Sequence, residues 1–399
     1  MTSSAFPAQE MSTTFAVLGA GRQGTAAAYD FVLQGGAEEV VLADVDLGRA
    51  KAAADRVNRL TRDRVARAAR VDVTKTDSIL GVLKRVDVFL SAVPYVFNLG
   101  IARAAVRAKA SMVDLGGHTA TARKQIALDR QARKAGITIV PECGMGPGAN
   151  VTLAVHAMSL LDRADEVRVY DGGLPQRPRP PWFYELTFHI AGLTNEYTGE
   201  ATFLRNGELV RVPALAEPEP LVVPPVGPLE AAVTSGGLST MPWTYRGRLR
   251  VLENKTLRYP GHWAQILAFA DLGLFSDRPV RARGTKVIPR EFFETLFEPQ
   301  VTPKEIRDIA VTRVVARGEK GGRTAEAVVD MVDTYDERTG FRAMERVTGW
   351  HAAIAAEMIA RGEVPPGARG VESAIPPQQF VEEGRRRGFA IGTRVGPIG

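Results

Sequence analysis

The sequence predicts an α/β protein in which a doubly wound parallel sheet is followed by an α+β domain with a mixed sheet. Over residues 14–149, short and nearly continuous apolar runs alternate with helical segments, as in parallel sheets covered on both faces. From residue 150 onward, alternating residues and frequent prolines and glycines indicate strands with one solvated face. The 399 residues are enough for two hydrophobic cores.

Six apolar runs are expected to form the strands of the parallel sheet: 15–18, 40–43, 68–73, 86–91, 111–115 and 137–140. Helices are expected between them, over 24–34, 47–60, 98–109 and 120–135.

The first turn between a strand and a helix carries the stretch VLGAGRQG at 17–24. Gly19 permits a tight turn, Gly21 lets the backbone approach a pyrophosphate, and Gly24 allows the helix to pack closely on the strand. The free N–H groups at the helix start would face the phosphates. The turn therefore predicts a dinucleotide-binding Rossmann domain, with cofactor contacts from Gly19, Gly21, Arg22, Gln23 and Gly24.

Asp44, at the end of the second strand, indicates which dinucleotide is bound. A carboxylate accepts a hydrogen bond from a ribose 2′-hydroxyl and repels a 2′-phosphate, so NAD is favoured over NADP. Arg49, a few residues on, keeps NADP as the alternative.

The residues after the other strands should lie around the same crevice, because ligands of doubly wound sheets bind beyond the carboxyl ends of the strands. Four titratable groups there are the candidates for acid and base chemistry, with roles that the sequence leaves open: Tyr95, Asp114, His118 and Glu142. Further cofactor contacts are expected from Asp72, Val73, Ala92, Val93, Pro94 and Gly144. The segment 141–148 around Gly144 suits the nicotinamide end of the cofactor or a Gly-Pro hinge.

In the second domain, strands are expected over 167–170, 182–190, 250–257, 309–317 and 325–334, and helices over 150–161 and 342–361. Glycines beside hydroxyls in TSGGLST (234–240) and cations in KTLRYPGH (255–262) suit an anionic end of a substrate. The cations could equally serve as structural bridges. The predicted substrate contacts are Tyr95, Ser235, Gly236, Lys255, Arg258 and His262.

We therefore divide the chain into a disordered leader (1–13), a NAD-binding Rossmann domain (14–149), an α+β substrate and dimerisation domain (150–341) and C-terminal helices that pack back on the first domain (342–399). The single cysteine, Cys143, suits a reducing cytoplasm. Dispersed histidines indicate no metal site, scattered arginines no nucleic-acid partner, and the lack of an apolar run of roughly 18 residues no membrane span.

With these segments in view, the chain resembles the saccharopine dehydrogenase family, and most closely its lysine 6-dehydrogenase-like branch. The resemblance extends from Phe15 to about Gly388 and rests on VLGAGRQG, LADVD, DLGGH, DGGLP, TSGGLST and KTLRYPGH. It implies a two-domain protein, often a homodimer, that oxidises a carbon–nitrogen bond of an amino acid. It also implies that Tyr95 lies beside the substrate and that Glu142 and Cys143 line the nicotinamide pocket.

Two departures from the fungal members of the family bear on the substrate. Those members resemble this chain less well around Ala191, where they would place an arginine for a second substrate carboxylate, and they tend to have Asp where Gly146 stands. Both differences favour free lysine over a bulky dicarboxylate.

The leading expectation is NAD-dependent oxidation of L-lysine to its 6-semialdehyde with release of ammonia, in which Glu142, His118 or Asp114 accepts the amine proton. The alternatives are a saccharopine-type or carboxynorspermidine-type dehydrogenase, a homospermidine synthase-like transferase, and a non-catalytic NAD-binding regulator.

Overall fold

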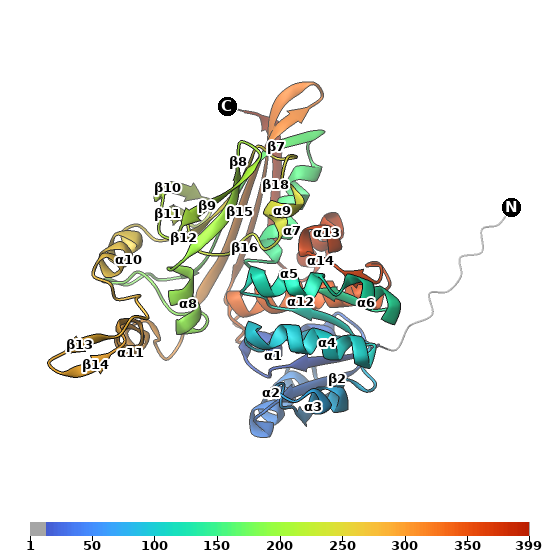
Figure 1. Cartoon of the computed structure of the whole chain (residues 1–399). Coiled ribbons are helices and arrows are strands. Elements are labelled where there is room, and N and C mark those ends of the chain that lie inside the picture. Colours follow the sequence, from blue (N-terminus) through green and yellow to red (C-terminus); the bar gives the residue numbers. More distant parts are fainter. Residues whose placement is uncertain (1–12, 399) are drawn as a thin grey trace.

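The computed structural model describes residues 13–398, which form two large sheets and a small two-stranded one, with helices packed around them (Figure 1). Apart from Thr13, which begins the first strand, the leader expected over 1–13 lies outside the described residues. The predicted fold class is confirmed: a parallel sheet lies in the N-terminal half and a separate mixed sheet in the C-terminal half.

The first sheet is fully parallel and has the strand order β17-β6-β5-β4-β1-β2-β3. Successive strands are added on one side of β1 up to β3 and on its other side from β4 onward, so the strand order reverses between β1 and β4. Ligands bind at this reversal in doubly wound folds. The strands are β1 (Thr13–Leu18), β2 (Ala37–Asp44), β3 (Ala66–Arg70), β4 (Val88–Ser91), β5 (Ser111–Asp114), β6 (Thr138–Val140) and β17 (Gly367–Ala368). Six helices connect the first six strands: α1 (Arg22–Leu33), α2 (Leu47–Thr61), α3 (Thr76–Leu83), α4 (Asn98–Ala108), α5 (Thr119–Ile126) and α6 (Asp129–Ala135). The helix expected over 120–135 is thus two helices.

The second sheet is mixed because β7 and β12 run parallel while its other neighbours are antiparallel. Its strands are β7 (Arg163–Pro175), β8 (Glu200–Arg205), β9 (Glu208–Pro213), β10 (Glu219–Val223), β11 (Gly227–Ala232), β12 (Val251–Arg258), β15 (Asp308–Lys320), β16 (Arg323–Thr334) and β18 (Ala390–Pro397). The strands expected at 167–170, 309–317 and 325–334 fall within β7, β15 and β16, and the strand expected at 250–257 overlaps β12 with a shift of one residue.

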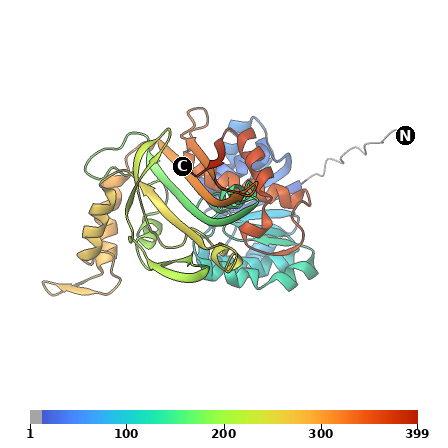
Figure 2. The same cartoon turned by 90° about the horizontal axis from the view of Figure 1, so that it is seen from above.

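The strand expected over 182–190 was wrong. The segment has no regular structure until α8 (Ile190–Glu196) begins at its end. Its aromatic and aliphatic side chains instead pack with α10 (His262–Asp271) and α11 (Pro289–Val301) in an aromatic cluster. Together with the hairpin of β13 (Val280–Ala282) and β14 (Thr285–Val287), these helices form an arm that projects from the second sheet (Figure 2).

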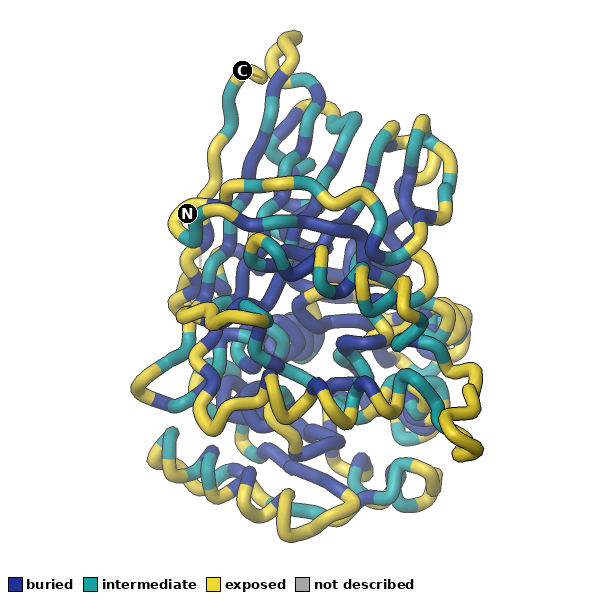
Figure 3. Tube along the Cα trace, turned by 90° about the vertical axis from the view of Figure 1, so that its left-hand side faces the viewer, coloured by how far each residue is buried: buried dark blue, intermediate teal, exposed yellow. Residues whose placement is uncertain are grey.

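Helix α12 (Ala343–Ala360) packs against α1, β4 and β5 of the first sheet and against β15 and β16 of the second. Because both sheets cover it, α12 is apolar and buried around most of its circumference, as a central helix must be. One large cluster of buried residues draws on both halves and includes α12. In both halves the buried parts of the chain lie toward the inside (Figure 3).

Beyond α12, the C-terminal segment contributes to both halves. It contains α13 (Val371–Ala374) and α14 (Pro377–Arg386), which pack on α7 (Ala149–Ser159). It also adds β17 to the edge of the first sheet and β18 to the edge of the second, where we expected helices alone.

Candidate functional site

The turn after β1 has the geometry that a dinucleotide needs. Gly19 has a φ of +105°, and a Cβ there would lie 2.5 Å from the carbonyl oxygen of Ala92. A Cβ at Gly24 would lie 2.1 Å from the carbonyl oxygen of Gly19, so α1 packs directly on the turn. Gly21 differs, since its Cβ position has no protein atom within 4 Å. The residues present therefore leave a cradle at the start of α1 that fits a pyrophosphate.

Asp44 lies beside this cradle at the end of β2. Its Oδ2 accepts a hydrogen bond from Ala20 N at 3.0 Å, and its Oδ1 accepts one from Asp46 N at 3.0 Å. These bonds fix the orientation of the carboxylate. Arg49 is largely exposed, with its Nη1 4.0 Å from Asp44 Oδ2.

The other predicted cofactor residues follow β3 and β4. Ala92, Val93 and Pro94 lead from β4 past the glycine turn, with Val93 Cγ1 3.1 Å from the Cβ position of Gly19. Asp72, next to Val73, closes its own turn by accepting a hydrogen bond from Thr74 Oγ1 at 2.6 Å. That hydroxyl is the main reason why the pKa of Asp72 is lowered.

Asp114 organises the loops at the ends of β5 and β6. Its carboxylate accepts hydrogen bonds from Gly116 N at 2.8 Å, Glu142 N at 3.1 Å and Gln125 Nε2 at 2.7 Å. Burial raises its pKa, although these bonds oppose the shift. With its oxygens occupied by local donors, Asp114 supports the loop that carries Glu142.

Glu142 is 1% exposed and has a left-handed backbone with a φ of +64°. One carboxylate oxygen accepts a hydrogen bond from His118 N at 3.1 Å, and the other accepts one from the Ser239 hydroxyl of the second domain. Burial raises the pKa of Glu142 to about 7, the Asp114 carboxylate adds to the shift, and the Ser239 hydrogen bond opposes it. Glu142 is therefore a buried carboxyl that exchanges a proton near neutral pH.

His118 and Tyr95 lie near this carboxyl but are more open to solvent. Their rings stack with centroids 4.7 Å apart, and His118 Nδ1 lies 2.9 Å from Thr121 Oγ1.

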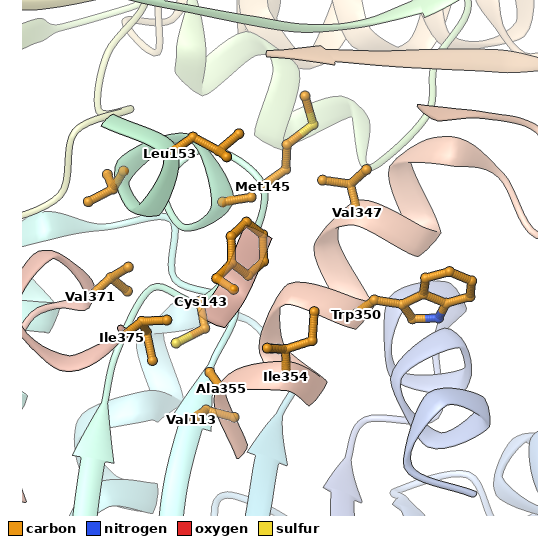
Figure 4. Close-up of a cluster of buried hydrophobic side chains, with 14 of the residues drawn as sticks. Val113, Cys143, Met145, Leu153, Val347, Trp350, Ile354, Ala355, Val371 and Ile375 are labelled. Carbon is orange, nitrogen blue, oxygen red and sulfur yellow. The ribbon is translucent and has the colours of Figure 1, made fainter. Parts of the chain in front are cut away.

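The Cys143 side chain, by contrast, is fully buried among apolar groups that include Val113, Ile354 and Val371 (Figure 4). Burial raises the pKa of the Cys143 thiol far above its usual value, so the thiol is a packing group.

A cavity of about 180 Å³ extends from the dinucleotide turn to the second sheet. It is lined on the first-domain side by Gln23, Leu115, Gly144, Met145 and Gly146, and on α12 by Met344 and Thr348. The second domain contributes Asp171, Gly172, Gly173, Phe188, Glu196, Thr234, Ser235, Gly237, Asn254, Thr256 and Arg258. Since Gln23 and Gly144 belong to the predicted cofactor site, a molecule in this cavity would lie next to the cofactor.

Arg258 is the cation among the described residues that line the cavity, and it is 2% exposed. Its Nη1 donates to Leu257 O at 2.9 Å, and its Nη2 lies 3.7 Å from Glu196 Oε2. Its Nε has no hydrogen-bond partner. That nitrogen is sealed from solvent, and the guanidinium carbon lies 5.1 Å from the ring centroid of Tyr184 and 5.8 Å from that of Trp263.

Asp171 and Glu196 are the two acids of the cavity lining. Burial raises the pKa of Asp171 to about 6 and that of Glu196 to about 7, while the positive charge of Arg258 opposes both shifts. The Oδ1 atom of Asp171 accepts hydrogen bonds from Asn254 Nδ2 at 2.5 Å and Asn150 Nδ2 at 3.5 Å. A positively charged ligand group in the cavity would stabilise both carboxylates in their ionised forms.

Of the other predicted substrate residues in the second domain, only Ser235 lines the cavity, and Gly236, Lys255 and His262 do not. Lys255 lies on the opposite face of β12 from Arg258 and contacts Glu219 Oε1 at 3.1 Å. His262 is buried, with its Nε2 3.0 Å from the Tyr197 hydroxyl, and burial lowers its pKa to about 3. Lys255 and His262 thus have structural partners of their own.

Sequence reasoning missed the residues that give the cavity its acidic character, Asp171 and Glu196, and the serine that contacts Glu142, Ser239. Asp171 did carry a signal, because an acid within the strand run VRVYDGGLP is unusual unless it is paired or functional. Ser239 lies within TSGGLST, which was singled out for the substrate, but nothing in the segment pointed to Glu142. Glu196 stands in a polar stretch and offered no signal.

Fold and site together define a two-domain dinucleotide-binding protein with a charged small-molecule cavity between its domains. Family models described as the saccharopine dehydrogenase NADP binding domain and the saccharopine dehydrogenase C-terminal domain match residues 15–140 and 144–389. The chain belongs to the saccharopine dehydrogenase family.

Two curated relatives are similar to parts of the chain. The NADP(+)-dependent, L-glutamate-forming saccharopine dehydrogenase of Saccharomyces cerevisiae is 24% identical over 221 residues, 53% of this chain and 49% of the relative. The mitochondrial alpha-aminoadipic semialdehyde synthase of Bos taurus is 23% identical over 350 residues, 70% of this chain and 37% of the relative. The match therefore spans about half the length of the yeast relative and less of the bovine one.

Two solved structures share the fold. Apo saccharopine dehydrogenase (L-Glu forming) from Saccharomyces cerevisiae has a TM-score of 0.79 and 19% identity, covering 96% of this chain and 100% of that one. Homospermidine synthase from Legionella pneumophila, in complex with NAD, has a TM-score of 0.64 and 11% identity, covering 97% and 92%.

Within residues 13–398, no helix combines the length and apolar character required to cross a membrane. Over the same residues, no three His, Cys, Asp or Glu side chains are grouped so as to hold a metal ion.

Proposed function

We propose that the chain catalyses the NAD-dependent oxidation of the terminal carbon–nitrogen bond of L-lysine, giving the 6-semialdehyde and ammonia. The observation that carries this proposal is the charge of the cavity. Among its described lining residues there is one cation, Arg258, and there are two acids, Asp171 and Glu196. This set complements a ligand with one carboxylate and two amino groups, which is the charge pattern of lysine. A substrate with several carboxylates would leave anionic groups facing anionic walls.

The reaction requires an unprotonated amine, because an ammonium has no lone pair to assist departure of hydride from the adjacent carbon. The lysine amine has a pKa of about 10.4, so at neutral pH a protein group must accept its proton. We assign this role to Glu142, supported by its pKa of about 7 and by its hydrogen bond from Ser239, whose segment 234–240 borders the cavity. The nicotinamide, when bound, supplies the hydride acceptor. Water then adds to the imine carbon, and ammonia leaves.

The cofactor that we propose is NAD. The support is the Asp44 carboxylate, which two backbone N–H groups orient beside the glycine turn and which would accept from a ribose 2′-hydroxyl. The matching family model is described as NADP binding, so the choice needs direct measurement. We expect kcat/KM to be at least about tenfold higher with NAD than with NADP, about 1.4 kcal/mol of discrimination. Equal values would refute the assignment to Asp44.

The decisive assay offers the purified protein NAD or NADP with L-lysine, saccharopine, diaminopimelate and polyamines, and follows nicotinamide absorbance together with product mass. Reduction of NAD with lysine and appearance of the cyclised semialdehyde are expected. Turnover of saccharopine in place of lysine would support the saccharopine-type alternative. Amine transfer without net NADH would favour a homospermidine synthase-like reaction. Tight NAD binding without turnover of any amine would indicate a regulator.

The role of Glu142 has its own test. We expect Glu142→Gln to lower kcat by about 10²–10⁴-fold, the usual loss for a general base, while the NAD dissociation constant changes little. In the wild type, kcat/KM should fall below a pH of about 7 as Glu142 becomes protonated. A Glu142→Gln variant with wild-type kcat would remove Glu142 from the mechanism.

A further inference from the structure

The Asp171 carboxylate presents one of its two oxygens to the cavity. Its Oδ1 is held by the side-chain amides of Asn254 and Asn150, whereas Oδ2 accepts no hydrogen bond from the described residues. The two amide donors fix the plane of the carboxylate. The oxygen that remains is thus a pre-oriented acceptor in the wall of a cavity.

Gly146 makes room for this oxygen. A Cβ at position 146 would lie 2.3 Å from Asp171 Oδ2, closer than any real contact, so any other residue there would displace the carboxylate. The backbone of Gly146 is not left-handed, and its lack of a side chain is therefore explained by this contact. Gly146 and Asp171 come from different domains and meet at the cavity wall.

The unsatisfied donor of Arg258 lies on the same wall. In the parallel pairing of β7 with β12, Asp171 is opposite Thr256, and Arg258 is two residues further along β12 on the same face. The free oxygen of Asp171 and the cationic side chain of Arg258 therefore line one wall of the same cavity from neighbouring strands. An acceptor and a cation side by side complement the ammonium and the carboxylate of a single α-amino acid head.

We infer that Asp171 binds the α-ammonium group of the substrate while Arg258 binds its α-carboxylate, so that the cavity selects free α-amino acids and directs their side-chain amine toward the cofactor. The inference rests on the proposed function and deepens it by fixing which end of the substrate each charged residue holds.

The experiment uses calorimetry on the full chain saturated with NADH, where no turnover occurs. It compares L-lysine with 6-aminohexanoate, which keeps the carboxylate and the terminal amine but lacks the α-amino group. We expect the wild type to bind L-lysine about ten- to a hundredfold more tightly, the usual value of a hydrogen bond between charged groups. In Asp171→Asn the two ligands should bind equally, because the loss falls on lysine alone.

Gly146→Ala provides a second variant that retains the carboxylate but displaces its oxygen. It should also remove the preference for lysine over 6-aminohexanoate. Asp333→Asn is the matched control, because Asp333 is another buried acid with a raised pKa that lies outside the cavity lining, and it should keep the preference. Circular dichroism and NADH affinity verify folding of each variant.

The outcomes separate the inference from the function on which it rests. Lysine oxidation by the wild type, combined with equal losses for both ligands in Asp171→Asn, would overturn the inference and leave the proposed function standing. A wild type that binds 6-aminohexanoate as tightly as lysine would do the same. A wild type that neither binds nor oxidises lysine would refute both.

Discussion

The molecule contains two clusters built around a buried arginine, and they differ in how completely the guanidinium is paired with carboxylates. The first cluster, called the interface cluster because it joins α1, α12 and the end of α14, contains Arg387, Asp30 and Glu357. Nε of Arg387 lies 2.8 Å from Asp30 Oδ2, and its Nη2 lies 2.7 Å from Glu357 Oε2. Its Nη1 pairs with Glu383, so each guanidinium nitrogen has a carboxylate partner.

In the second cluster, called the cavity cluster, the guanidinium of Arg258 lies farther from the carboxyls of Asp171 and Glu196. Its single ion pair, between Arg258 and Glu196, is 3.7 Å long, and the Nε of Arg258 has no partner. A buried donor without a partner costs free energy, which a bound ligand can recover. The comparison teaches that a buried arginine with a carboxylate at every nitrogen, like Arg387, is committed to the fold, whereas one with a single carboxylate at 3.7 Å, like Arg258, has charge left for the ligand that we propose.

The largest expected effect concerns the interface cluster. Arg387→Met should lower the free energy of unfolding by about 3–5 kcal/mol, because it leaves Asp30 buried without its cation and Glu357 with only Arg361, whose Nη1 lies 3.7 Å from Glu357 Oε2. Chemical denaturation measures this loss. Turnover per folded molecule should be unchanged. A loss below about 1 kcal/mol, the range of exposed pairs, would show that the cluster contributes no more than a surface ion pair.

The matched change in the cavity should act on binding instead. Arg258→Met should weaken L-lysine binding by about 1.5–3 kcal/mol, the value of hydrogen bonds to charged groups. It should destabilise the fold less than Arg387→Met, because Glu196 is 32% exposed at its side chain and keeps access to water. If both arginine variants lost stability equally, the distinction between the clusters would fail.

The interface cluster should also make stability depend on pH. Burial raises the pKa of both Asp30 and Glu357, and the nearby Arg387 offsets only part of that shift. At pH values between the unfolded and the folded pKa values of these carboxyls, the folded state binds more protons than the unfolded state. The free energy of unfolding should therefore fall as pH rises from about 4, the unfolded pKa, through the higher folded values.

Asp30→Asn removes one titrating group, so the free energy of unfolding should fall less between pH 4.5 and 7.5 than in the wild type. The difference should be about 1 kcal/mol or more, which corresponds to a pKa shift of roughly one unit for Asp30. Denaturation curves at the two pH values measure it. An unchanged slope would mean that Asp30 is ionised throughout this range.

Glu142 is an intermediate case, a buried carboxyl paired only with neutral donors. The Ser239 hydrogen bond lowers the pKa of Glu142, so Ser239→Ala should raise it. The acidic limb of the pH profile of kcat/KM should then move upward by up to about one pH unit, or about 1.4 kcal/mol. Ser235→Ala in the same segment is the control, because Ser235 donates to Asn195 O and should leave the limb in place. A limb that is equally unmoved in both variants would contradict the role of Ser239.

The first domain could be predicted from the sequence because its signals are local. Each buried strand is a short apolar run, and Gly19, Gly21 and Gly24 mark one turn unambiguously. The segment 182–190 was mistaken for a strand because its aromatic residues have high strand propensity. Their packing with α10 and α11 overrides that propensity, and nothing near 182–190 in the sequence announces it.

The substrate half was harder to predict because its residues converge from distant elements. Lys255 and Arg258 were grouped by sequence proximity, yet an odd spacing within a strand places side chains on opposite faces, and β12 does so. Asp171 and Glu196 approach Arg258 only through the pairing of β7 with β12 and the fold of α8. Register between strands far apart in sequence is not encoded in any short segment.

Helix α12 limits how this molecule can move. Both sheets pack on it and share one apolar core around it, so a hinge that opened the two domains would expose the helix to water on one side. The segment 234–240 borders the cavity through Thr234, Ser235 and Gly237, and its Leu238, Ser239 and Thr240 are buried. The walls of the cavity therefore belong to one packed frame, and separating them would cost the burial of α12.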